Sequence, residues 1–186
     1  MPDFTDICPA RKSGYTIGNA DVDSAAAIAV TKIGTRTLYL SFPPQSMQNT
    51  GTVSNSGVFP TVCFDDATQR YSRLAFALPA EYSSGAISVD IYWITAATTG
   101  DAKFTVDIKS TTTGGTTASE NQQTIATTTD ATANEINKST VSFAASLLAS
   151  GDIVGIQITR DGTDAADTIG ADLYVLLVVV SYTGRG

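Results

Sequence analysis

The sequence predicts an all-β protein: an antiparallel, jelly-roll-like β-sandwich with an extended N-terminal arm. Apolar and polar residues alternate with a period of two in several segments, which is the pattern of a strand with one face on a core. Gly and Asp turns separate these segments, and the last segment is apolar at odd and even positions alike. Many antiparallel strands without heptads or internal repeats indicate a sandwich or jelly roll, not a fibre shaft.

The chain begins with a segment that has no regular pattern. Two Pro and two Gly residues interrupt residues 1–24, which we expect to form the arm. Residues 25–186 are then expected to form one sandwich domain. Residues 45–57 are expected to form a polar loop, and about 110–135 a long polar loop with at most one weak strand.

Strands are expected wherever alternation or a short apolar run lies between turn residues. For 25–33 a helix is the alternative, and the segment at 141–149 is expected to end in a helical turn. The expected strands are 25–33, 36–42, 58–64, 71–78, 86–95, 103–109, 122–128 (weak), 141–149, one within 150–162, and 173–182.

Alternation also predicts which side chains face the core. Trp93 shares a face with Ile91, so it is expected in the core, whereas Tyr92 points the other way and is a candidate for binding or for an interface. Arg160–Gly162 are expected to turn the chain after a strand. The other residues expected to face inward are Leu38, Leu40, Phe42, Leu74, Phe76, Leu78, Ile87, Val89, Phe104, Val106, Ile108, Val154, Ile156 and Ile158.

The segment from Leu173 to Tyr182 is apolar on both faces of a strand. A strand of that kind is expected to be covered on both sides, by the N-terminal arm or by another subunit. Leu173, Val175, Leu177 and Val179 are therefore candidates for sandwich core or trimer contacts.

Composition excludes several classes of function. The formal net charge is −7 and the 11 basic residues are scattered, so nucleic acid is not an expected partner. The chain has no His, which removes the commonest general base and most zinc sites, so we expect neither an enzyme nor a cofactor. The two cysteines, Cys8 and Cys63, could form one disulfide, but two thiols define no framework.

The apolar runs are too short for a membrane segment. The longest runs from Leu173 to Val180, whereas roughly 20 residues are needed to cross a bilayer. The N-terminus also lacks a charged region followed by an apolar region, so no secretory signal is expected. We therefore expect a protein made in the cytoplasm of its host and no membrane partner.

Three carboxylates at short spacing invite a metal interpretation. Asp161, Asp164 and Asp167 could contribute oxygen ligands to Ca²⁺, but the spacing is not that of an EF-hand loop. The alternative is a solvated turn between two strands, with Gly162 at a positive φ. The sequence favours the turn and no metal.

Several short motifs follow one another between residues 64 and 182. They are FDD at 64–66, F-x-LP-x-x-Y at 76–82, G-x-I-x-V-x-I-Y-W at 85–93, TTGDAKFTVDI at 98–108, and the segment 147–182 with R-D-x-x-D-x-x-D-T inside it. In this order they resemble a β-sandwich, jelly-roll-like family of structural proteins of tailed bacteriophages. The resemblance implies a decoration (cement), head-fibre or tail-fibre-tip protein of the virion and implies no catalytic residues.

The sequence favours a non-enzymatic phage virion protein that decorates and stabilises the assembled head. On this hypothesis it is a homotrimer on the capsid surface, bound to the major capsid protein and made in the bacterial cytoplasm. The alternative is a receptor- or carbohydrate-binding tip module of a tail or head fibre, which would use the 110–135 loop and Tyr92. Candidate interface residues in the arm are Phe4, Ile7, Arg11, Lys12 and Tyr15.

Overall fold

The computed structural model describes residues 35–83, 85–111, 118–144 and 148–185, with the backbone alone for 118–120. The chain divides into two units, residues 1–34 and 35–186, and the structure below is that of the second unit. The expected arm, its interface candidates and the expected element at 25–33 lie outside the described residues.

The described residues form eleven strands and one short 3-10 helix. The elements are β1 (Thr35–Phe42), η3 (Pro44–Ser46), β2 (Gln48–Asn49), β3 (Thr52–Ser56), β4 (Phe59–Phe64), β5 (Gln69–Ala77), β6 (Ile87–Thr95), β7 (Asp101–Thr111), β8 (Ala118–Thr128), β9 (Asn137–Phe143), β10 (Ile153–Asp161) and β11 (Leu173–Arg185). Two of them, β2 and β3, occupy the segment 45–57 where a loop was expected. That expectation was wrong because Gln, Asn, Ser and Thr also suit short strands at a sheet edge.

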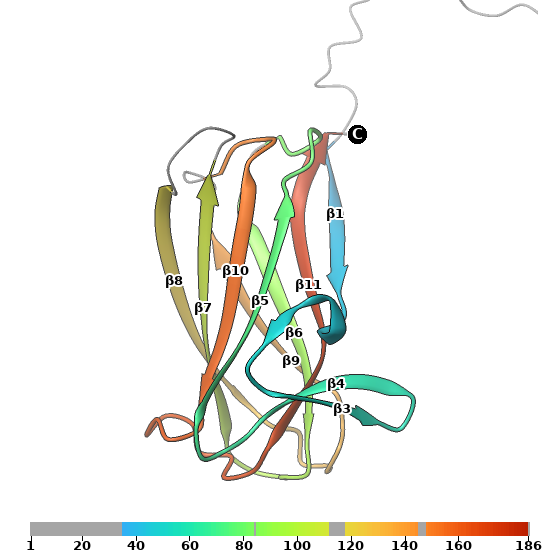
Figure 1. The fold of residues 1–186 in the computed structure, drawn as a ribbon, viewed down its shortest axis with the longest axis vertical. Coiled ribbons are helices and arrows are strands. Elements are labelled where there is room, and N and C mark those ends of the chain that lie inside the picture. The colour runs from blue at the N-terminus through green and yellow to red at the C-terminus, as the bar shows by residue number, and fades with distance from the viewer. Residues whose placement is uncertain (1–34, 84, 112–117, 145–147, 186) are drawn as a thin grey trace, which may run out of the picture. The chain divides into compact units, whose positions relative to one another are not determined.

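The strands pair into two antiparallel sheets that face each other. The six-stranded sheet has the order β3-β4-β11-β6-β9, with β1 paired to the remaining part of β11, and the five-stranded sheet has the order β2-β5-β10-β7-β8. In Figure 1, β8, β7, β10 and β5 of the five-stranded sheet lie in front of β6, β9 and β11 of the other sheet. The predicted jelly-roll-like antiparallel sandwich is confirmed.

The core lies between the two sheets and is built as the alternation predicts. Ile91 and Trp93 of β6 face Phe104 of β7, and the Trp93 and Phe104 ring centroids are 6.0 Å apart. The indole Nε1–H of Trp93 donates to the hydroxyl of Ser139 over 3.0 Å, so burial leaves no unpaired donor on this ring. Trp93 is thus a core residue, as expected.

A change of register in β11 explains the apolar run at the C-terminus. The pairing with β6 shifts between Val175 and Leu177, where Leu176 is the extra residue. Inward side chains are therefore odd-numbered before the bulge (Leu173, Val175) and even-numbered after it (Val178, Val180). The run is apolar at odd and even positions because the inward-facing positions change from odd to even at the bulge. It therefore does not require that both faces of the strand be covered.

The candidates Leu173, Val175, Leu177 and Val179 do not share one face, for the same reason. Leu173 and Val175 are buried in the core, whereas Leu177 and Val179 lie half-buried on the outer face of the six-stranded sheet. An inserted residue reverses the alternation beyond it, and no local pattern marks the insertion.

The segment expected to turn at Arg160–Gly162 also differs from the expectation. Arg160 is the penultimate residue of β10 and is 0% exposed. Gly162 does not have a positive φ. A Cβ there would lie 2.4 Å from the backbone oxygen of Asp66, so the close approach of that backbone requires the glycine.

Candidate functional site

A row of five polar side chains crosses the outer face of the five-stranded sheet. The residues lie directly opposite one another in successive strands, so their side chains project from the same face. The row consists of Gln48 on β2, Arg73 on β5, Gln157 on β10, Asp107 on β7 and Gln122 on β8. Arg73, Asp107 and Gln157 each lie between two buried residues of their strand, which places them at outward positions.

Beside this row the sheet surface is hollowed. A hollow of about 520 Å³ is lined by Arg73, Asp107 and Gln157 and by the small residues Ala75 and Gly155. Ala75 and Gly155 are cross-strand neighbours, so two adjacent strands lack a side chain of any length at this point. A Cβ at Gly155 would meet nothing within 4 Å, which shows that the space above the strand is open.

A second hollow continues the first on the other side of the row. Its volume is about 320 Å³, and it shares Asp107 and Gln157 with the first hollow. It is lined mainly by polar groups, among them Lys103, Thr105 and Thr159. The two hollows with the row between them are called the sheet groove below.

Hydrogen bonds hold four of the five side chains of the row in place. The Nε–H of Arg73 donates to Oε1 of Gln157 over 2.6 Å, and Nε2 of Gln157 donates to Thr159 over 3.0 Å. Nε2 of Gln122 donates to Oδ1 of Asp107 over 2.7 Å. Side chains fixed in this way lose less conformational entropy when a ligand binds.

Arg73 also covers an aromatic ring. Its guanidinium carbon lies 4.2 Å from the centroid of the Tyr71 ring, in a cation–π contact. In the hydrogen bonds between described residues, Arg73 uses only its Nε–H, although a guanidinium carries five N–H donors. The contact with Tyr71 thus orients a group that has further donors for a ligand.

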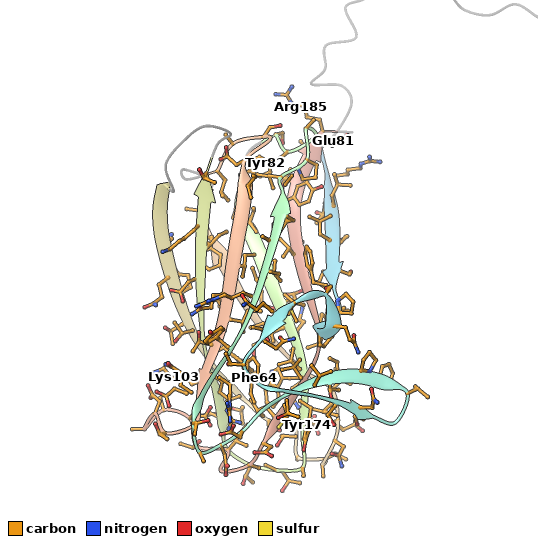
Figure 2. The ribbon with its side chains drawn as sticks, viewed as in Figure 1. Phe64, Glu81, Tyr82, Lys103, Tyr174 and Arg185 are labelled. Atoms are coloured by element: carbon orange, nitrogen blue, oxygen red, sulfur yellow. The ribbon has the colours of Figure 1, made fainter. Side chains whose placement is uncertain are left out.

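An ion pair lies in the lining of the second hollow. Lys103 pairs with Asp164, and Figure 2 shows Lys103 beside the loop that joins β10 to β11. Hydrogen bonds to the carboxylate, from Lys103 first and from the backbone of Ala166 next, lower the pKa of Asp164. Asp164 is therefore ionised at neutral pH.

The three carboxylates considered as calcium ligands have separate protein partners. Asp161 accepts bonds from the backbone and hydroxyl of Thr163, and Asp164 pairs with Lys103. Asp167 is bound by two guanidinium nitrogens of Arg160, over 2.8 and 2.9 Å. Among the described residues no group of three or more His, Cys, Asp or Glu could hold a metal ion. The solvated turn that was the alternative also differs from what is observed, because Asp167 is buried and Gly162 has no positive φ.

The described interface candidates lie on the six-stranded sheet. Tyr92 is the cross-strand neighbour of Leu177 and of Lys138 on its outer face, and Val179 lies two residues further along β11. The structure therefore brings Tyr92, Leu177 and Val179 together, on the sheet opposite to the groove. Leu173 and Val175 belong to the core.

Cys63 is a free thiol, and Cys8 lies outside the described residues. Burial, and next the negative charge of Asp172, raise the pKa of Cys63 to about 11. The thiol therefore stays protonated and weakly nucleophilic at neutral pH.

The 3-10 segment, which is the sole helix in the described part of the chain, is far too short to span a membrane.

The residues of the sheet groove were not predicted from the sequence. Alternation placed Lys103 and Asp107 on an outward face, and the same pattern applies to Arg73 and Gln157. What it lacks is the strand order β2-β5-β10-β7-β8, which places these residues in one row. A glycine inside an otherwise regular strand, at Gly155, is the signal that could have indicated a hollow.

Comparisons with known proteins were informative at the level of structure alone. No family model matches the chain, and no curated protein is similar in sequence. The fold is similar to that of "CBM35 from Cellvibrio japonicus Abf62", with a TM-score of 0.53 and 16% identity over 79% of this chain and 98% of that one.

Two further solved structures are similar to the chain in fold. "Xyl-CBM35 in complex with glucuronic acid containing disaccharide" has a TM-score of 0.53 and 14% identity, over 79% of this chain and 99% of that one. A family 35 carbohydrate-binding module from an environmental isolate has a TM-score of 0.51 and 11% identity, over 76% and 91%. At such low identities the similarity shows the fold alone, which is a jelly-roll β-sandwich.

Proposed function

We propose that this protein is a non-catalytic carbohydrate-recognition module and that the sheet groove binds the glycan. The observation that carries the proposal is the row of Gln48, Arg73, Gln157, Asp107 and Gln122 beside the floor of Ala75 and Gly155. Such a site combines a shallow floor with convergent polar groups held by mutual hydrogen bonds.

The chemistry of the row suits sugar hydroxyls. A carboxylate accepts two hydrogen bonds, a guanidinium donates two in parallel, and an amide does both, so each can engage neighbouring hydroxyl groups of a ring. The floor has little polar surface, which suits the C–H face of a sugar. Because the polar row crosses all five strands, the groove offers contacts to several successive sugars of a chain.

The similar structures support this proposal over decoration of a phage head. The three structures described above are named as carbohydrate-binding modules, and one of them was solved with a disaccharide. We extend the proposal to the tip of a phage tail or head fibre on the strength of the motif resemblance. Decoration of the assembled head by a homotrimer stays a prediction of the sequence.

The test is glycan binding by the full chain, first on a glycan array and then by calorimetry with the best ligand. We expect Arg73→Ala and Asp107→Ala to weaken binding about 10- to 100-fold, because each removes hydrogen bonds that involve a charged group. If both variants bind the glycan as the wild type does, the binding site lies elsewhere. Absence of binding to any glycan, together with binding to phage heads, would favour the decoration hypothesis.

A filled groove separates binding from folding. Gly155→Val places a branched side chain in open space on a central strand, so we expect unchanged or slightly higher stability but no glycan binding. Ser41→Val, at an exposed position of β1 on the other sheet, is the matched control and should bind normally. Normal binding by Gly155→Val would overturn the assignment of the groove.

A further inference from the structure

The β3–β4 hairpin presents an edge strand that lacks the usual protection. β3 is the outermost strand on one side of the six-stranded sheet, so one of its edges has no strand of the described residues beside it. Exposed edges are normally protected by charges, proline or bulges. The five residues of β3, TVSNS, include no charge and no proline, and the pairing of β3 with β4 has no register shift.

The other edge strands among the described residues differ from β3. Arg36 lies in β1, Glu120 in β8 and Lys138 in β9, and β2 is two residues long. A charge within an edge strand opposes pairing with a second strand. Therefore β3 is the described edge best suited to pairing.

Apolar side chains lie beside this edge. Val53 is 54% exposed, Val58 is 89% exposed and Phe59 is 53% exposed, all within one hairpin. β4 pairs with β11 only over Val62–Phe64, and Figure 1 shows the hairpin extending beyond the neighbouring strands. Exposed apolar groups grouped around a free strand edge indicate a contact surface.

The charge distribution indicates which partner fits. The sequence from Thr37 to Phe64 has no charged residue, although the chain has a net charge of −7. Two copies of an acidic protein repel each other least where their surfaces are uncharged. We propose that β3 pairs with the β3 strand of a second copy, antiparallel across a twofold axis, to give a symmetric dimer.

The proposed register makes the contact self-complementary. With full overlap, Ser54 lies opposite the second copy's Ser54, and Thr52 lies opposite its Ser56. Every position then pairs small uncharged side chains, and the free backbone groups of both edges are satisfied. A five-residue edge is small for a protein interface, so the dimer is weak and forms at high protein concentration.

Sedimentation velocity over a wide range of concentrations tests the dimer in the full chain. We expect reversible dimers that are not weakened by added salt. Ser54→Lys, which brings two lysines together at the axis, should weaken association at least tenfold, whereas Thr37→Lys on β1 should not. Affinity for a short glycan that occupies one site should be the same in Ser54→Lys and the wild type, so failure of the dimer is distinguishable from failure of the sheet groove.

A charge-reversal mixture provides a second readout. Ser54→Asp should also stay monomeric alone, and an equimolar mixture with Ser54→Lys should form mixed dimers. A monomer at all concentrations, or an oligomer unchanged by Ser54→Lys, would overturn the proposal. Binding of neutral lipid vesicles that depends on Val58 and Phe59, without dimerisation, would assign the hairpin to a lipid surface and overturn it as well.

Discussion

At the scale of single residues, the ion pair between Arg160 and Asp167 is the most demanding feature of the fold. Both side chains are buried, and Arg160 also donates to the carbonyl of Phe64 over 2.8 Å. A buried charge without its partner costs far more than an exposed one. The pair thereby ties the end of β10 to the loop after it and to the end of β4.

We therefore expect Asp167→Ala to lower the free energy of unfolding by about 3–5 kcal/mol, because it leaves the guanidinium buried and uncompensated. Urea unfolding measures the change. The matched control is Asp164→Ala, which breaks the ion pair between Asp164 and Lys103. This pair is more exposed than the pair between Arg160 and Asp167, so the control should lose much less stability. Equal losses in the two variants would contradict this account of Arg160.

Asp65 leads to a prediction about acid stability. Partial burial alone would raise the pKa of Asp65, but hydrogen bonds from Arg70 and Thr68 lower it from 3.8 to about 2. A folded-state pKa below the ordinary value stabilises the protein above pH 3.8, and this stabilisation is lost as the pH falls toward 2. Asp65→Asn should flatten the dependence of unfolding free energy on pH in that range.

Urea unfolding at a series of pH values measures this slope. The control is Asp66→Asn, which removes a neighbouring carboxylate that accepts none of these bonds and should leave the slope near that of the wild type. An unchanged slope in Asp65→Asn would show that the bonds from Arg70 and Thr68 do not stabilise the folded state.

At the scale of elements, two loops pack backbone against backbone at one end of the sandwich. A Cβ at Gly162 would come within 2.4 Å of the carbonyl oxygen of Asp66, so the loop after β10 touches the loop after β4. We expect Gly162→Ala to cost about 1–3 kcal/mol, because neither backbone can move aside freely.

Thermal unfolding tests this contact. Gly155→Ala, whose new methyl group meets open space, should leave stability unchanged or raise it slightly. If both alanine variants unfold at the temperature of the wild type, the two loops are free to separate and the contact has no structural role.

The elements also show what the sequence can and cannot predict. Alternation identified the inward faces of β6, β7 and β10, because a period of two reports burial directly. It missed the bulge at Leu176, the edge strand β3 and the burial of Arg160. The bulge, the burial of Arg160 against Phe64 and the row in the sheet groove depend on partners distant in sequence. β3 pairs with the adjacent β4 and was missed because its polar residues resemble those of a loop.

At the scale of the whole molecule, the two proposed surfaces lie on different sheets. The groove belongs to β5, β7 and β10 of the five-stranded sheet, and the edge strand β3 belongs to the six-stranded sheet. A dimer through β3 therefore does not use the residues that line the groove. Two copies would present two glycan sites, and tethering two weak sites raises the overall affinity for a polymeric ligand.

The unit formed by residues 35–186 is expected to fold without the preceding residues. Every core residue identified in the described part of the chain lies between Leu38 and Tyr182, so both sheets bury their inner faces against each other. We expect a shortened chain that begins at Thr35 to unfold cooperatively near the temperature of the full chain. Differential scanning calorimetry and circular dichroism measure this.

The same shortened chain distinguishes the two functions considered. Glycan binding through the sheet groove should survive the deletion, because all of its lining residues lie after Thr35. Binding to phage heads through Phe4, Ile7, Arg11, Lys12 and Tyr15 should be lost, because the deletion removes all five. A shortened chain that folds, binds no glycan and still binds heads would contradict both the groove and the role expected for the arm.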